Sequence, residues 1–309
     1  MYKRQYESGA KVTTGRCNIA LGVKAMCGCA NPNMSVNSSD RNVAIGYQTG
    51  MFATSGGLNA MVGPYVGQYS STGSQNVFMG YYTAGSGTIS GDSNVALGSL
   101  TLRNLTSGVG NIALGASAAQ CKTNTHYSVV IGHFAGQQNN TEGFIAIGEN
   151  AAKEVTGGCS VAIGVDALRG GTTPSNNTGT YNFAGGYATL QQNTGGSSNI
   201  VIGDQAGKCN LTGGRNVFLG GVVGCSNTTG VGNVAIQCGA LRCNVSGTFN
   251  IAIGNNAGRD NISGNCSIYL GESAGLSNTT GVCNIALGSQ AMALSTCGGS
   301  NIATGEHAS

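Results

Sequence analysis

The sequence is poor in charged groups and in the large side chains that fill a thick hydrophobic core. Only 8% of its 309 residues are charged, and it has no tryptophan, three prolines and three histidines. Its net charge of +3 comes from scattered lysines and arginines, so it offers no basic stripe that could neutralise a phosphate backbone. No apolar run approaches the roughly 18 residues of a membrane-spanning helix. We therefore expect neither nucleic acid as a partner nor a membrane span in this segment.

The groups that usually carry catalysis are also isolated. His126, His133 and His307 have no serine, cysteine or carboxylate companion at a recurring spacing, so no triad or acid/base pair is indicated. The glycine pairs lack the Lys-Ser/Thr of a phosphate loop, and the calcium-binding nonapeptide with its regular aspartate does not occur. We predict that the chain is not an enzyme and has no catalytic residue, no cofactor and no metal site.

Glycine and cysteine are abundant instead. The chain has 54 glycines and 12 cysteines. A chain so rich in glycine cannot pack the core of an ordinary globular domain of this length, whereas a narrow stack of similar coils needs only a thin apolar seam and glycine corners. The composition favours a repeat protein.

The repeat is visible directly, because copies of roughly N-[VI]-A-[IL]-G recur every 17 residues in the second half of the chain. Less regular copies precede them, and a strict period of this length is typical of a solenoid. We predict an all-β parallel β-solenoid, or β-roll, of about 17 rungs. The regular copies open at Asn182, Asn199, Asn216, Asn233, Asn250, Ser267, Asn284 and Asn301, and the earlier ones at Asn18, Asn42, Asn59, Asn76, Asn94, Asn111, Ser128, Phe144 and Ser160.

The whole chain, residues 1–309, is interpreted as a single repeat domain. Residues 1–17 form an atypical first repeat, 18–181 are less regular, and 182–309 are regular. Two longer intervals indicate loop insertions near 27–40 and 170–180, both rich in Gly, Asn, Ser and Pro. A solenoid normally has polar terminal caps, and none is visible in this sequence. We therefore expect a piece of a longer chain, or a unit that stacks end to end.

One regular repeat predicts two short strands and two turns per rung. Asn199 to Gly203 alternates polar and apolar side chains, as a short strand does. We place Ile200 and Ile202 inside the coil, and Val201 on the opposite, outer face, where a ladder of small residues could contact another chain. The expected inward ladders are Ile200, Val217, Val234, Ile251, Ile268 and Ile285, and Ile202, Leu219, Ile236, Ile253, Leu270 and Leu287; the expected outer ladder is Val201, Phe218, Ala235, Ala252, Tyr269 and Ala286.

Five asparagines at one position of consecutive repeats begin N-x-[ST] sequons. They are candidate N-glycosylation sites, but an asparagine ladder that caps a turn explains the same pattern. Asn193 holds this position without being a sequon, since Asn193-Thr194 is followed by Gly195, so the position takes Asn whether or not sugar can be attached. The ladder sequons begin at Asn210, Asn227, Asn244, Asn261 and Asn278, and further sequons at Asn33, Asn37, Asn104, Asn139, Asn176 and Asn265.

Several cysteines recur at one repeat position in neighbouring repeats. In-register residues of stacked coils lie about 4.8 Å apart, within the separation that a disulfide accepts. Disulfides between coils would imply an oxidising compartment. Free thiols that act as small apolar residues, and a metal site near Cys27-Gly28-Cys29 that lacks a second matching pair, are the alternatives. The candidate disulfide residues are Cys209, Cys225, Cys243, Cys266 and Cys283.

Three stretches carry a resemblance to a known repeat class. NVAIGYQTG (42–50), NIAIGNNAG (250–258) and SNTTGVCNIALGSQA (277–291) resemble the repeats of trimeric autotransporter adhesin heads. They resemble more closely the N-T-T-G-x-x-N-x-A-I-G arrays of phage and bacterial tail-fibre-like proteins. The resemblance implies a homotrimeric, surface-displayed rod that spaces or presents a receptor-binding element. The 17-residue period and the 12 cysteines depart from the adhesin heads.

These observations lead to three functional hypotheses. The first is a structural or adhesive extracellular fibre segment, a rod-like spacer or attachment shaft at a cell surface or on a virion, whose partner is itself in a homotrimer. The second is a self-assembling extracellular filament subunit that stacks end to end. The third is a head module that binds a cell-surface receptor or glycan through the loop insertions.

Overall fold

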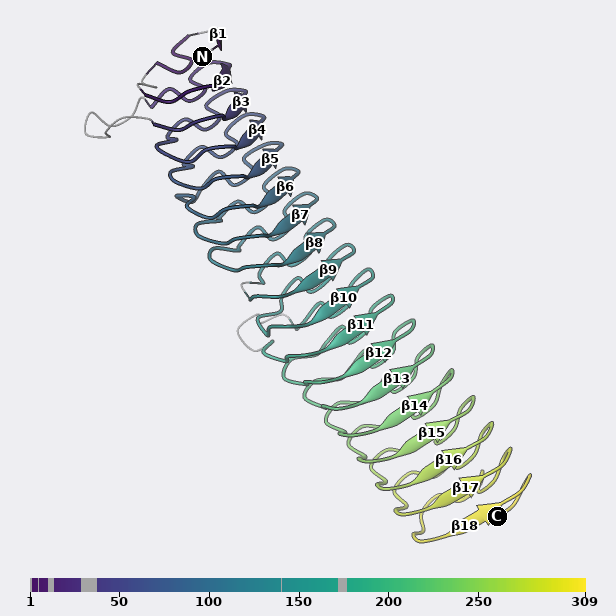
Figure 1. The fold of residues 1–309 in the computed structure, drawn as a ribbon. Helices are drawn as coiled ribbons and strands as arrows, with labels where there is room; N and C mark the ends of the chain where they lie inside the picture. The colour runs from purple at the N-terminus through teal and green to yellow at the C-terminus, as the bar shows by residue number, and fades with distance from the viewer. Residues whose placement is uncertain (1, 5, 11–13, 29–37, 140, 172–176) are drawn as a thin grey trace. The chain divides into compact units, whose positions relative to one another are not determined.

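The structure is a computed structural model that describes the chain except residues 1, 5, 11–13, 29–37, 140 and 172–176. Much of the insertions predicted near 27–40 and 170–180 therefore lies outside the described residues. The chain divides into two compact units, Met1–Asn150 and Ala151–Ser309. Within each unit, three-residue strands lie side by side in chain order (Figure 1).

The first unit holds β1 (Tyr2–Arg4), β2 (Ile19–Leu21), β3 (Val43–Ile45), β4 (Ala60–Val62), β5 (Val77–Met79), β6 (Val95–Leu97), β7 (Ile112–Leu114), β8 (Val129–Ile131) and β9 (Ile145–Ile147). The second unit holds β10 (Val161–Ile163), β11 (Phe183–Gly185), β12 (Ile200–Ile202), β13 (Val217–Leu219), β14 (Val234–Ile236), β15 (Ile251–Ile253), β16 (Ile268–Leu270), β17 (Ile285–Leu287) and β18 (Ile302–Thr304).

Neighbouring strands within a unit pair in parallel and in register. Ile200 of β12 pairs with Val217 of β13, and Ile202 pairs with Leu219, so equivalent residues one period apart face each other. The predicted parallel β-solenoid with a 17-residue repeat is confirmed. A glycine ends almost every strand, for example Gly203 at φ 140°. A Cβ on Gly203 would lie 2.1 Å from the carbonyl oxygen of Gly220 in the next coil, so the close stacking of coils requires glycine there.

The prediction of two strands per rung needs correction, because the described coils contain one strand each. The segment expected to be the second strand consists of turns, with Gln205 at φ 52° and Gly207 at φ 55°. Its backbone still bonds to the neighbouring coil, since the N–H of Gly207 donates to the carbonyl of Val223 at 2.9 Å. This side is held by regular hydrogen bonds between coils without extended geometry.

The predicted inward and outward faces of the strand are inverted. Val201 and Phe218, placed outside, are completely buried, and the same holds for Ala235 and Tyr269. Ile200, placed inside, is 49% exposed. In β2 to β18 the first and third residues lie on the outer face of the sheet, and the middle residue fills the coil. The middle ladder therefore cannot contact another chain.

The buried asparagine explains this inversion. Side chains of a strand alternate in direction, so Asn199 and Val201 must lie on one side of the backbone. Asn199 is fully buried, because its amide bonds to backbone groups inside the coil. The narrow interior then accepts mostly alanine at the middle position, and the larger aliphatic side chains are left outside.

Candidate functional site

An asparagine ladder lies inside each unit at the residue before the strand, and we call it the opening ladder. In the second unit Asn233 represents it: its N–H and Nδ2 both donate to Asn216 Oδ1, at 2.9 and 3.2 Å, and Nδ2 also donates to the carbonyl of Gly247 at 2.8 Å. Asn233 Oδ1 then accepts the N–H of Asn250 at 3.0 Å. Each amide thus links three coils, and the ladder satisfies backbone groups that would otherwise be buried without partners.

A second ladder, the turn ladder, holds the five regular sequons. Asn227 Nδ2 donates to Asn210 Oδ1 at 2.7 Å and to the carbonyl of Gly230 at 3.1 Å. Gly230 also accepts from Asn216 of the opening ladder at 2.9 Å, so the two ladders meet at one carbonyl. The ladder sequon asparagines are buried, with at most 2% of their surface exposed, at Asn210, Asn227, Asn244, Asn261 and Asn278.

A glycan on these amides does not fit the folded coil, because the nitrogen that would carry sugar is buried and donates inside the protein. The geometry favours the structural interpretation of the ladder. Among the other sequons, Asn139 is buried, whereas Asn104 and Asn265 are half-buried. Asn265 Oδ1 accepts the N–H of Thr248 at 2.7 Å. Asn33, Asn37 and Asn176 lie outside the described residues.

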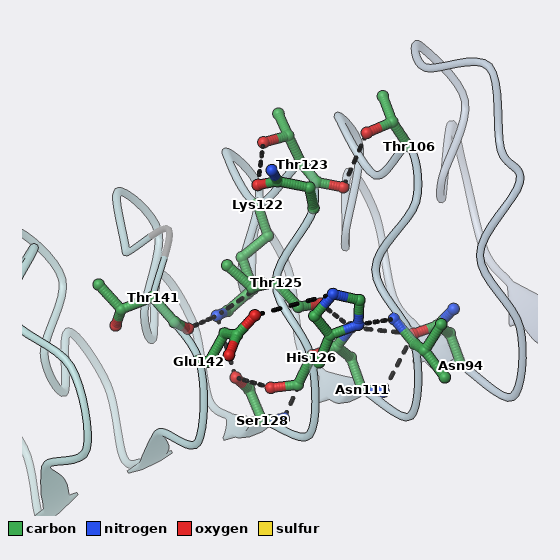
Figure 2. Close-up of polar contacts among 12 residues, drawn as sticks. Asn94, Thr106, Asn111, Lys122, Thr123, Thr125, His126, Ser128, Thr141 and Glu142 are labelled. Atoms are coloured by element: carbon green, nitrogen blue, oxygen red, sulfur yellow. Dashed lines mark hydrogen bonds and ion pairs between the residues drawn. The ribbon is translucent and has the colours of Figure 1, made fainter.

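In the first unit a lysine occupies the turn ladder. Lys122 follows Asn111 by 11 residues, as Asn210 follows Asn199, and it is completely buried. Its Nζ donates to Thr125 Oγ1 at 3.2 Å, to Ser128 Oγ at 3.1 Å and to the carbonyl of Thr141 at 3.0 Å (Figure 2). Ser128 belongs to the opening ladder, and its short side chain leaves space for the ammonium group.

The three acceptors of Lys122 are neutral, so the charge is hydrogen-bonded but not paired. Burial lowers the pKa of Lys122 to about 7, because a low-dielectric interior disfavours the charged amine. The next ladder residue also lacks a contact: among the described residues, Asn139 Nδ2 has no hydrogen-bond partner. Lys122 occupies the ladder position at which other coils have an asparagine, whose Oδ1 accepts a hydrogen bond from the Nδ2 of the next ladder residue. Sequence reasoning missed Lys122, although its alignment with Asn210 was readable.

His126 and Glu142 lie near this lysine but at the surface. His126 Nδ1 accepts the N–H of Val109 at 3.1 Å. His126 Nε2 lies 3.7 Å from Glu142 Oε1 (Figure 2). The Glu142 side chain is largely exposed. This pair connects two neighbouring coils.

The candidate disulfide cysteines are free thiols in the structure: Cys209, Cys225, Cys243, Cys266 and Cys283. Cys209 and Cys225 lie in neighbouring coils, where the N–H of Cys209 donates to the carbonyl of Cys225 at 3.0 Å. Burial, together with nearby Asp260, raises the pKa of the Cys243 thiol, which makes this sulfur a poor nucleophile at neutral pH.

Thiol labelling distinguishes free thiols from disulfides. We expect iodoacetamide to modify Cys266 and Cys283, both exposed, in the folded protein without reduction. Cys243 should react more slowly, because it is half-buried and its thiol pKa is raised. Mass spectrometry of peptides after labelling gives the readout. Labelling of Cys266 and Cys283 that requires prior reduction would instead support the disulfide between these two coils.

Two ladders of half-exposed aliphatic side chains follow the outer face of each sheet. They consist of the first and third residues of β2 to β18, which are aliphatic except Phe183, Gly185 and Thr304. We call this surface the strand face. Ile202 is 44% exposed and Ile253 is 37% exposed. No charged residue occupies these positions in β10 to β18. This uncharged apolar surface was not predicted, because these residues were assigned to the interior.

A cleft of about 490 Å³ opens in the second unit beside Gly170 and Gly171, where the second insertion begins. Glu154, Arg169 and Gln191 also line it.

Within the described part of the chain, no cluster of three or more His, Cys, Asp or Glu side chains could hold a metal ion. The described residues also include no helix long and apolar enough to cross a membrane. Comparison of the chain with protein-family models, curated proteins and solved structures finds no match.

Proposed function

We propose that the chain is a non-enzymatic, extracellular fibre segment whose strand face is covered by further copies of the same chain, in a homotrimer. The observation that carries the proposal is the pair of exposed aliphatic ladders, which runs along β10 to β18 and again along β2 to β9. Soluble monomers rarely expose contiguous apolar patches larger than a few hundred Å².

The size of the strand face fits a stable interface. The outer strand positions of the second unit are aliphatic except Phe183, Gly185 and Thr304, and their side chains are half-buried or exposed. Together they amount to on the order of 1,000 Å² of apolar surface, and a standard interface buries about 800 Å² per partner. An identical chain suits this surface, because its coils have the same spacing and its ladder is equally uncharged. The resemblance to adhesin heads and tail-fibre-like proteins adds the expectation of three chains.

Charges on the strand face are expected to separate the chains. We predict that Ile202→Lys combined with Ile253→Lys converts the oligomer to a monomer, because two buried ammonium groups in each copy would face one another across an apolar contact. Light scattering after gel filtration and native mass spectrometry measure the change.

The matched control is Thr212→Lys combined with Thr229→Lys, which adds equal charge at exposed turn positions away from the strand face. This control should keep the wild-type mass. A wild-type protein that is monomeric at micromolar concentration, or an oligomer that persists in the isoleucine variant, would contradict lateral self-association.

A further inference from the structure

Tyrosines are concentrated in one part of an aromatic-poor chain. Aromatic residues are 6% of the sequence, yet five of its eleven tyrosines fall between residues 47 and 82. Tyr47 and Tyr81 both follow the opening asparagine by five residues, and Tyr65 and Tyr82 follow it by six. Stacking of the coils that contain β3, β4 and β5 therefore brings the rings together. We call Tyr47, Tyr65, Tyr81 and Tyr82 the tyrosine platform.

The rings contact one another directly. Tyr65 lies at the centre, with its ring centroid 5.2 Å from Tyr47 and 6.1 Å from Tyr81, both in edge-to-face geometry. Tyr82 lies 5.6 Å from Tyr65. Edge-to-face contacts are a favoured arrangement of aromatic pairs, so the rings support each other in fixed orientations. Tyr47 is 43% and Tyr81 51% exposed, so the platform offers ring surface to solvent.

Polar side chains surround the platform. Gln48 Nε2 donates to the Tyr47 hydroxyl at 3.0 Å, and Gln68 Nε2 donates to Gln48 Oε1 at 3.0 Å. The Arg103 guanidinium lies 5.2 Å from the centroid of the Tyr82 ring. Aromatic surface with hydrogen-bonding groups at its edge can bind a ligand that is apolar on one face and polar around it.

The charge of the site narrows the class of ligand. The segment that holds the platform has no carboxylate, since no aspartate or glutamate occurs between residues 41 and 91. A cationic ligand would meet Arg103 without an acidic partner. A purely apolar ligand would leave the hydroxyls and amides unused. A pyranose has an apolar C–H face and a rim of hydroxyls, which matches both features.

We propose that the tyrosine platform binds a saccharide chain, with pyranose C–H faces on the tyrosine rings and sugar hydroxyls bonded to Gln48, Arg103 and the phenol groups. The platform spans successive coils about 4.8 Å apart, so a polymer lying along it meets a ring at each coil. This inference extends the proposed function by naming what the fibre attaches to, and it does not depend on how many chains assemble.

The test uses the intact chain and the variant Tyr65→Asn/Tyr82→Asn. Both tyrosines have positive φ, 60° and 54°, a conformation that asparagine tolerates better than most residues, so folding should be kept. The probes are a printed array of defined oligosaccharides and insoluble cellulose, chitin and α-glucan. We expect binding to at least one pyranose polymer, and a loss of about ten-fold or more in affinity in the variant.

Tyr187→Ala is the matched control. Tyr187 follows Asn182 by five residues, as Tyr47 follows Asn42, and is 54% exposed, but it belongs to the second unit. The Tyr187→Ala variant should bind the saccharide probes with the same affinity as the wild type. Failure of the wild type to bind every probe, or equal losses in the control and the platform variant, would overturn the proposal. Oligomer mass, measured on the same samples, reports separately on the fibre proposal.

Discussion

Replacing Lys122 with asparagine is expected to stabilise the first unit at neutral pH and to remove a pH dependence of its stability. The pKa of Lys122 falls from 10.5 to about 7 on folding. Below about pH 7 the amine is charged in the folded and unfolded states, and the cost of burying that charge is fully present. Between about pH 7 and 10.5 the unfolded chain binds a proton that the folded chain does not, so stability rises with pH.

The expected size follows from the shift. The free energy of unfolding of the wild type should rise by up to about 1.4 kcal/mol per pH unit above neutrality, to a total of about 5 kcal/mol at most, relative to Lys122→Asn. Urea unfolding at about pH 7 and about pH 9, followed by hydrogen exchange of the coils around residue 122, measures the difference. The comparison with the variant removes the contribution of other groups that titrate in this range.

Two further variants separate the charge from the ladder contact. Lys122→Met removes the amine without supplying an acceptor to Asn139 Nδ2, so it should lose the pH dependence but gain less stability than asparagine. Lys208→Asn changes a half-buried lysine of the second unit and should leave the pH dependence as in the wild type. Parallel pH profiles for the wild type and Lys122→Asn would show that Lys122 is not buried as described.

The repeat class was predictable, whereas the orientation of the strand was not. The 17-residue period predicted parallel, in-register stacking, and the pairing of Ile200 with Val217 confirms it. The rule that apolar residues lie inside then placed Ile200 and Ile202 in the interior. Instead, the opening asparagine determines which face of the strand is buried, because its amide satisfies backbone groups that only an inward side chain can reach. A hydropathy pattern carries no information on such bonds.

The ladder sequons show the same limit of prediction from a sequence pattern, and Asn193 provides a signal that overcomes it. Asn193, which is not a sequon, donates its Nδ2 to the carbonyl of Gly196 at 2.9 Å, as the ladder sequons do with their own turn glycines. A position that keeps Asn without the sequon was therefore a sequence signal for a buried structural role. Lys122 replaces an asparagine of this ladder, and the consensus repeat does not predict it. The tyrosine platform depends on tyrosine positions that differ by one residue between coils, and the consensus repeat does not predict it either.

Loss of one opening-ladder amide is expected to be among the most damaging single changes. Asn233→Ala removes the acceptor of the Asn250 N–H, which remains buried. It also removes one of the two donors to the Gly247 carbonyl, which keeps its bond from Asn244 Nδ2. A buried polar group without a partner costs about 1–3 kcal/mol and one further lost hydrogen bond about 1 kcal/mol, so we expect a loss of about 2–4 kcal/mol from the second unit. Urea unfolding gives the measurement. Asn255→Ala, at an exposed position, should change stability by less than about 0.5 kcal/mol.

Asn233→Ser tests whether the inward acceptor is the essential group. The chain already uses serine in this ladder, where the N–H of Asn284 donates to Ser267 Oγ at 3.2 Å and the N–H of Asn182 donates to Ser160 Oγ at 3.1 Å. Serine keeps an acceptor for the next coil but does not provide the bifurcated amide donor, so its cost should fall clearly below that of alanine. Equal costs for serine and alanine would mean that side-chain volume, and not hydrogen bonding, holds the asparagine inside. A larger loss of stability for alanine than for serine would establish that a polar ladder fixes which face of each strand is buried, and hence why the aliphatic face is left outside.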